Sequence, residues 1–230
     1  MSYYFLGDEL YFPPVTRASS EGVVAIGGDL SEERLLLAYQ SGIFPWFSDG
    51  EPIIWWSPDP RFVLYPQNVK VSKSMQQLFR KNTFEVTFDK SFEQVILNCK
   101  KIKREGQNGT WITDDMVAAY CSLHQKGFAH SVEVWQSGVL VGGLYGLSLG
   151  DSFFGESMFA KVSNASKYGF IALVNALEKK GFNLVDCQVH TEHLESLGAE
   201  YIPRKKFLES LKKSLQKETL QGNWGELLTN

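Results

Sequence analysis

The segment from residue 130 to residue 203 most constrains the fold, because few architectures allow the order of elements that it predicts. Alternating apolar and polar residues predict a strand at His130–Trp135, which the turn Ser137-Gly138 joins to a return strand at Val139–Leu147. The elements expected next are a strand at Asp151–Phe159, a helix opened by Ser163-Asn164-Ala165-Ser166 and ending at Gly181, a strand at Asn183–Val189, and a terminal helix begun by Pro203. This order predicts an α+β fold with at least one crossover connection.

Two of these strands carry polar side chains where apolar ones are expected. Glu156 directly follows a glycine inside an aromatic run, and burying an unpaired charge is costly, so this carboxylate needs a partner or a substrate. Asp186 and Gln188 lie two positions apart in the later strand and are expected to point to one face of the sheet. If the two strands are neighbours, these three side chains line a single pocket with aromatic walls.

The beginning of the chain is expected to be mostly irregular. Residues 1–30 are predicted to be loops, because Pro13-Pro14 and several glycines interrupt them. Ser31 has the character of an N-cap, and two glutamates follow it in what would be the first turn of a helix that stops at Gly42.

Three tryptophans set among prolines, Trp46, Trp55 and Trp56, follow that helix without the periodicity of a helix or a strand. They either fill the join between two domains or present a stacking face. The turn Pro58–Pro60 is the expected boundary between a small N-terminal domain, residues 1–60, and a larger domain, residues 61–230.

Two groups of basic residues stand out in a chain whose net charge is −3 and whose pI is about 5.9. The first group lies in and just before a helix expected at Ser72–Lys81. The second group lies at the end of another helix, whose start is predicted by the capping-box pattern Ser91-x-x-Gln94. The first group is Lys70, Lys73, Arg80 and Lys81, and the second is Lys100, Lys101, Lys103 and Arg104. A charge run is usually a solvated face, so any contact with phosphate must come from such local patches.

Several kinds of site are not supported by the sequence. It contains neither the glycine-rich loop of NTPases nor that of dinucleotide enzymes, and no serine in G-x-S-x-G. The spacing Cys187-x-x-His190-x-x-His193 does not match the standard zinc patterns. We therefore expect neither a metal nor a cofactor. With three unpatterned cysteines and no apolar run near about 18 residues, we expect a cytoplasmic protein without membrane attachment.

The expected pocket thus has carboxylates, an amide and aromatic walls, but no evident nucleophile. Direct attack of one substrate on another fits such a site, with the protein supplying alignment and a base. An α-amine with a pKa of about 7.7–8.0 needs little help to attack an activated ester near neutral pH.

Nine blocks of the sequence, taken in order, form a further pattern. They are Gly27-Gly28-Asp29-Leu30-Ser31, Tyr39-x-x-Gly42-Ile43-Phe44-Pro45-Trp46-Phe47, Trp55-Trp56-Ser57-Pro58-Asp59-Pro60-Arg61, Gly109-Thr110-Trp111-Ile112, His130-Ser131-Val132-Glu133-Val134-Trp135, Gly155-Glu156-Ser157-Met158-Phe159, Asn164-Ala165-Ser166-Lys167, Asp186-Cys187-Gln188, and Ser196-Leu197-Gly198-Ala199 with Ile202-Pro203-Arg204. Through these blocks the sequence resembles the bacterial leucyl/phenylalanyl-tRNA–protein transferases over nearly its full length. Ala160 stands where a serine commonly closes the sixth block.

The resemblance implies a small N-terminal domain joined to a larger GNAT-like (acetyltransferase-like) mixed-sheet domain. It implies transfer of Leu or Phe from aminoacyl-tRNA to proteins that begin with Arg or Lys, which marks them for degradation, by a monomeric enzyme. The substrate-binding residues that it implies are Tyr39, Trp46 and Trp111, together with Leu144, Phe153 and Met158 for the transferred side chain. The catalytic residues that the resemblance implies are Asp186 with Gln188, which would assist the attacking amine, and Glu156, which would orient the cationic acceptor. Lys73, Arg80 and Lys81 are its candidate contacts with the tRNA acceptor stem.

Two other functions stay open at this point, and so does a purely structural role in which Glu156 and Asp186 form salt bridges with Arg or Lys inside the fold. A coenzyme A acetyltransferase would suit the order of strands, but the loop Ala160–Ser163 lacks the glycine-rich sequence that cradles a pyrophosphate. A binding module would hold tRNA or a protein amino terminus through the basic groups and Trp46, and would leave the aminoacyl ester intact.

Overall fold

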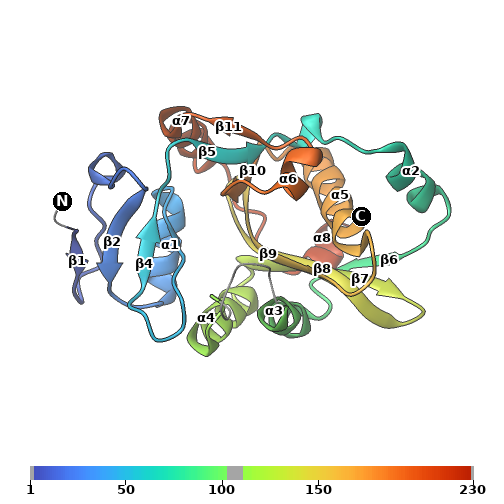
Figure 1. Cartoon of the computed structure of the whole chain (residues 1–230), viewed down its shortest axis with the longest axis horizontal. Helices are drawn as coiled ribbons and strands as arrows, with labels where there is room; N and C mark the ends of the chain where they lie inside the picture. The colour runs from blue at the N-terminus through green and yellow to red at the C-terminus, as the bar shows by residue number, and fades with distance from the viewer. Residues whose placement is uncertain (1–2, 103–110, 229–230) are drawn as a thin grey trace.

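The computed structural model describes residues 3–102 and 111–228 of the chain. It contains two β-sheets, and Figure 1 shows the smaller sheet at the N-terminal end of the molecule. Lys103, Arg104 and the predicted Gly106–Gly109 loop lie outside the described residues.

The smaller sheet has four strands in the order β1-β2-β4-β3. Its strands are β1 (Phe5–Leu6), β2 (Val23–Gly27), β3 (Phe44–Pro45) and β4 (Ile54–Trp56), with the 3-10 turn η1 (Val15–Arg17) and helix α1 (Glu32–Gln40) between them. Helix α1 begins as predicted, because the side chain of Ser31 accepts a hydrogen bond from the backbone N–H of Arg34.

Two predictions for this region are wrong. Residues 1–30 are not all loop, since β1 and β2 pair with each other, and Trp55 and Trp56 belong to strand β4. Strands β1, β3 and β4 have two or three residues, too few to show alternation, and the five residues of β2 are apolar or glycine and do not alternate. Their stability comes instead from pairing and burial, since Trp55 is fully buried.

The larger sheet has seven strands in the order β11-β5-β10-β9-β8-β7-β6. Its strands are β5 (Arg61–Leu64), β6 (Glu85–Phe88), β7 (Ala129–Gln136), β8 (Val139–Leu149), β9 (Ser152–Ala160), β10 (Leu184–Gln188) and β11 (Glu200–Ile202). Strands β9 and β10 are parallel and are joined by the predicted helical crossover, whereas the other neighbours pair antiparallel. The predicted α+β class, with its hairpin and crossover, is confirmed, but the short strands β5 and β11 were not predicted.

Helices cover both faces of this sheet, as Figure 1 shows. They are α2 (Lys73–Arg80), α3 (Phe92–Lys101), α4 (Asp114–Gln125), α5 (Ala165–Lys179), α6 (Glu192–Ser196), α7 (Arg204–Ser214) and α8 (Trp224–Leu227), with the 3-10 turn η2 (Pro66–Asn68) before α2. Helices α3 and α4 pack on one face and α5 on the other. The capping box predicted for α3 does not form, because the side chain of Ser91 makes no cap hydrogen bond and its backbone N–H donates to Glu133 instead.

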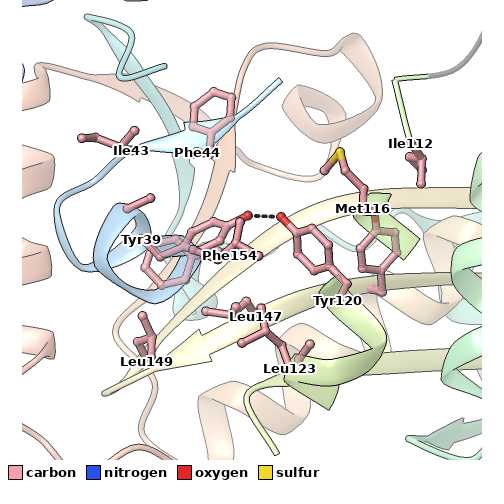
Figure 2. Packing of buried hydrophobic residues seen from close by; sticks show 14 of the residues in the cluster. Tyr39, Ile43, Phe44, Ile112, Met116, Tyr120, Leu123, Leu147, Leu149 and Phe154 are labelled. Carbon is pink, nitrogen blue, oxygen red and sulfur yellow. Dashed lines mark hydrogen bonds between the residues drawn. The ribbon is translucent and has the colours of Figure 1, made fainter. Parts of the chain in front are cut away.

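The two sheets share one hydrophobic core. Tyr39 from α1 packs against Phe154 of β9 with ring centroids 5.2 Å apart, and Figure 2 shows both beside Tyr120 of α4. The division into domains 1–60 and 61–230 stays a prediction, although the change from one sheet to the other falls at Pro58–Pro60. Within the described ranges, no helix is both long and apolar enough to cross a membrane.

Candidate active site

A cavity opens where the parallel strands β9 and β10 separate. Their pairing ends at Phe154 and Asp186, although β9 continues to Ala160 and β10 continues to Gln188. The residues beyond this point line a cavity of about 600 Å³, which is also lined by Pro45 of strand β3 and by Trp46, the residue that follows it. Eight of the predicted site residues line it, namely Trp46, Trp111, Leu144, Phe153, Glu156, Met158, Asp186 and Gln188.

Three groups hold the Glu156 carboxylate inside this cavity. Tyr39 Oη donates to Glu156 Oε1 at 2.7 Å, Tyr120 Oη donates to Oε2 at 3.0 Å, and Gln188 Nε2 donates to Oε1 at 2.7 Å. Burial raises the pKa of Glu156 to about 7, against the opposing effect of the hydrogen bonds from Tyr39, Gln188 and Tyr120. The carboxyl therefore changes charge near neutral pH.

The two tyrosine hydroxyls also contact each other, as the dashed line in Figure 2 shows. The two phenols and the Glu156 carboxyl thus make three mutual contacts, and each contact needs one proton. With both phenol protons donated to Glu156, the contact between the phenols has no proton; a protonated Glu156 that donates to one phenol frees that phenol to donate to the other. Ionisation of Glu156 leaves one contact without a proton, while burial and the nearby carboxylate raise the pKa of both tyrosines.

Asp186 does not face the cavity as a free carboxylate. Arg61 holds it through Nε and Nη2, which lie 2.8 Å and 2.6 Å from its two oxygens, and both side chains are fully buried. The backbone N–H of Gln188 also donates to Asp186 at 2.9 Å. This bond fixes Gln188, whose φ is +64° at an irregularity between β10 and β5. Asp186 thereby positions the residue whose amide reaches Glu156.

Arg61 in turn connects the two sheets. Its Nη1 donates to the carbonyl oxygen of Gly42 at 3.2 Å. Its guanidinium carbon lies 4.7 Å from the ring centroid of Phe44 and 4.6 Å from that of Phe207. The charge therefore sits between two aromatic faces, an arrangement that favours cations.

The other end of the cavity is apolar. Leu144 and Phe153 are almost fully buried, and Met158 lies opposite Leu144 in the pairing of β8 and β9. Trp46 is 37% exposed at the rim, where its carbonyl oxygen accepts a hydrogen bond from Trp56 Nε1 at 2.7 Å. A side chain without charge fits the inner end, and a flat ring fits the rim.

The remaining predicted residues lie elsewhere. Tyr39 stands behind Glu156, which it contacts, and does not line the cavity. Lys73 and Arg80 are on α2 and Lys81 ends it, and Figure 1 shows α2 at the edge of the molecule remote from the N-terminal sheet. The roles predicted for all these residues stay predictions.

Sequence reasoning missed two members of the site. Arg61 belongs to a quoted block, but its partner Asp186 is 125 positions away and no local pattern joins them. Tyr120 occupies an apolar position of helix α4 beside Met116 and Leu123, so nothing in the sequence separates it from ordinary core residues. Among the residues with described positions, no group of three or more His, Cys, Asp or Glu could hold a metal.

Comparison with known proteins gives consistent matches. A family model described as leucyl/phenylalanyl-tRNA protein transferase matches residues 63–212, and one described as the N-terminal domain of that protein matches residues 28–59. The leucyl/phenylalanyl-tRNA–protein transferase of Flavobacterium johnsoniae is 60% identical over 209 residues, covering 91% of this chain and 99% of its own. The leucyl/phenylalanyl-tRNA–protein transferase of Myxococcus xanthus is 52% identical over 228 residues, which cover 98% of this chain and 97% of its own.

Solved structures match more weakly. An aminoglycoside acetyltransferase from an uncultured soil metagenomic sample has a TM-score of 0.38 at 16% identity, covering 57% of this chain and 89% of its own. L-PGS from Bacillus licheniformis has a TM-score of 0.38 at 11% identity, covering 82% and 65%.

Proposed function

This chain belongs to the leucyl/phenylalanyl-tRNA–protein transferase family, and from that premise we propose how its cavity works and what it accepts. The enzyme is an aminoacyltransferase that moves Leu or Phe from aminoacyl-tRNA to a protein. Its acceptors begin with Arg or Lys and are thereby marked for degradation. It acts as a monomer in the cytoplasm.

The observation that carries the proposal is the polarity of the cavity. Its inner end, at Leu144, Phe153 and Met158, offers an apolar surface to the transferred side chain, and its other end offers the Glu156 carboxylate. An apolar pocket discriminates one methylene by only about 1–3 kcal/mol, so it accepts both Leu and Phe. A carboxylate ionising near neutral pH suits a cationic amino terminus.

The reaction needs no nucleophile from the protein. The α-amine nitrogen of the acceptor attacks the ester carbonyl carbon, a C–N bond forms, and the C–O bond to the tRNA ribose breaks. The amine loses a proton and the ribose oxygen gains one. Alignment of the two substrates can supply about 7–11 kcal/mol of the barrier, and a base that accepts the proton about 10²–10⁴-fold.

Each site residue has a role in this scheme. Gln188 and Glu156 orient the acceptor amine, and Asp186 acts by fixing the Gln188 backbone. Trp46 and Trp111 stack on the terminal adenosine, and Tyr39 orients Glu156. Lys73, Arg80 and Lys81 contact phosphates of the acceptor stem.

The test uses tRNA charged with [¹⁴C]-Phe and two peptides that differ only in a first residue of Arg or Glu. We expect label in the Arg peptide alone, and loss of at least about 10²-fold in a Gln188→Ala variant whose folding is verified by circular dichroism. A protein that binds the tRNA but leaves its ester intact would contradict the proposal and would be a binding module. Equal label in both peptides would contradict the Arg/Lys acceptor.

A further inference from the structure

The N-terminus of helix α5 forms part of the cavity wall and has unused hydrogen-bond donors. Asn164, at the N-cap, has a left-handed φ of +68° and makes no side-chain cap bond to the fifteen-residue helix. Among the described residues, the backbone N–H groups of Ser166 and Lys167 have no hydrogen-bond partner. Free amides at the start of a long helix favour an anion, because they add to the positive end of the helix dipole.

Ser166 gives a second and independent sign of a ligand. The residue is 9% exposed and lines the cavity, and its hydroxyl has no hydrogen-bond partner within the described ranges of the chain. A polar side chain on a residue that is nine-tenths buried normally finds a hydrogen bond. Because Ser166 lines the cavity, a substrate held there is in a position to supply one.

Two further groups stand at the same place. Lys167 Nζ reaches Ser196 Oγ of α6 at 3.4 Å, and Ser196 Oγ donates to the carbonyl oxygen of His193 at 2.7 Å. His193 lines the cavity, and its buried Nε2 has no partner in the described structure. Burial and the Lys167 charge lower the pKa of His193, so a neutral imidazole that carries its proton on Nε2 can donate it.

We infer that Ser166, Lys167 and His193, with the free amides of α5, form a subsite for the phosphodiester that joins the terminal adenosine of the donor tRNA to the preceding nucleotide. The inference rests on the proposed function, which places the aminoacyl-adenosine in this cavity. The chain of the tRNA must leave the cavity from that adenosine, and the first group it presents is an anionic phosphate. Lys161 adds a cation nearby, with its Nζ 5.6 Å from the ring centroid of the cavity residue Phe159.

The experiment compares two stable donor analogues, 3′-amino-3′-deoxyadenosine carrying Phe in amide linkage, with and without a 5′-phosphate. Calorimetry gives the dissociation constant of each for the full-length protein. We expect the phosphorylated analogue to bind about tenfold more tightly, as one or two charge-assisted hydrogen bonds would give. Lys167→Ala and Ser166→Ala should each reduce this ratio while leaving the affinity for the unphosphorylated analogue unchanged.

The matched control is Lys179→Ala, which removes an exposed lysine from the far end of the same helix and should leave the ratio intact. Equal binding of the two analogues would overturn the subsite and leave the transferase function standing. The subsite would also be overturned if the Ser166 and Lys167 variants left the ratio of the two dissociation constants unchanged. Tighter binding of coenzyme A than of the phosphorylated analogue would also overturn it, by assigning the anion site to a nucleotide cofactor.

Binding of neither analogue would overturn the subsite together with the placement of the adenosine. Transfer of Phe from intact tRNA to the Arg peptide, measured on the same preparation, then shows whether the proposed function survives. The failure of the inference and the failure of the function are therefore separate observations.

Discussion

Glu156 is the residue at which stability and function oppose each other. Its pKa is raised from 4.5 to about 7 in the folded protein, mainly by burial, so folding favours the protonated form. This contribution to stability is complete below pH 4.5 and is lost as the pH rises to about 7. The ionised carboxylate that attracts a cationic acceptor is thus the less stable form.

We therefore predict that the free energy of unfolding of the wild type falls between pH 5 and pH 8 by about 3 kcal/mol more than that of a Glu156→Gln variant. Urea denaturation of both proteins at several pH values measures the difference. The exposed Glu178→Gln is the control and should follow the wild type at every pH. Parallel curves for wild type and Glu156→Gln would show that this carboxyl does not titrate in that range.

The pair of Arg61 and Asp186 gives a second prediction at this scale. Asp186→Leu leaves a buried guanidinium without its partner, which should cost about 3–5 kcal/mol of stability. The double variant Arg61→Met/Asp186→Leu removes both charges and should recover at least half of that loss, as measured by urea denaturation. Additive destabilisation by the two changes would contradict the coupling.

The same double variant separates stability from catalysis. Its Gln188 N–H no longer has the Asp186 oxygen as acceptor, so the amide that faces Glu156 loses its anchor. We expect peptide labelling to stay low although the protein is folded. Recovery of wild-type labelling would show that Asp186 matters only for stability.

Among the elements, helix α2 has one apolar face and one basic face. Met75 is buried, and Phe79 stacks on Tyr168 of α5 with ring centroids 3.9 Å apart, which fixes the helix to the protein. Its basic residues are therefore held in place but not needed for packing, a combination that suits contact with a phosphate backbone.

We predict that the triple variant Lys73→Ala/Arg80→Ala/Lys81→Ala binds aminoacyl-tRNA more weakly and with a smaller dependence on salt. Each phosphate that the variant no longer neutralises should reduce the slope of log K against log salt by about 0.7–0.9. Filter binding across a salt series measures it. The exposed lysines of the control variant Lys179→Ala/Lys212→Ala/Lys213→Ala lie on other helices and should leave the slope unchanged. An unchanged slope in the α2 variant would remove this helix from the tRNA surface.

At the scale of the whole molecule, the sequence predicted what local patterns encode. The long strands β7, β8 and β9 and helix α5 carry the periodicity that defines them. Glu156 was found because a carboxylate in an aromatic strand conflicts with burial. Strands β1 and β11 have two and three residues, which are too few to show a hydrophobic period, and they are strands only because they pair with neighbouring strands.

The candidate site was less predictable than the fold, because long-range contacts decide what each carboxylate does. Asp186 and Gln188 were expected to point to one face of the sheet and to line the pocket with Glu156. The structure brings Arg61 to Asp186 from the start of β5 and Tyr120 to Glu156 from α4. Neither contact has a local signature, so the sequence identified the polar residues of the cavity but not their partners.

At the join between the two sheets, Gly42 faces helix α7. Its φ is +73°, and a Cβ there would lie 2.6 Å from Leu208 Cδ2 and 3.0 Å from Phe207 Cε1. The carbonyl of Gly42 also holds Arg61, whose guanidinium lies over Phe207. Gly42→Ala should therefore push the side chains of Leu208 and Phe207 aside, and with Phe207 the guanidinium of Arg61.

Gly50 provides a matched control, because its φ is +79° but a Cβ there would meet nothing within 4 Å. Gly50→Ala should cost about 1–2 kcal/mol for its backbone alone, and Gly42→Ala a further 1–3 kcal/mol or so for the crowding. The Gly42 carbonyl accepts a hydrogen bond from Arg61, which holds Asp186, and Gly42 shortly precedes Trp46 in the chain. Only Gly42→Ala should therefore also raise the KM for aminoacyl-tRNA. Thermal unfolding and steady-state labelling measure the two effects. Equal stability and equal KM in the two variants would show that the contact between α7 and Gly42 does not support the cavity, and would leave Arg61 as the link between the two sheets.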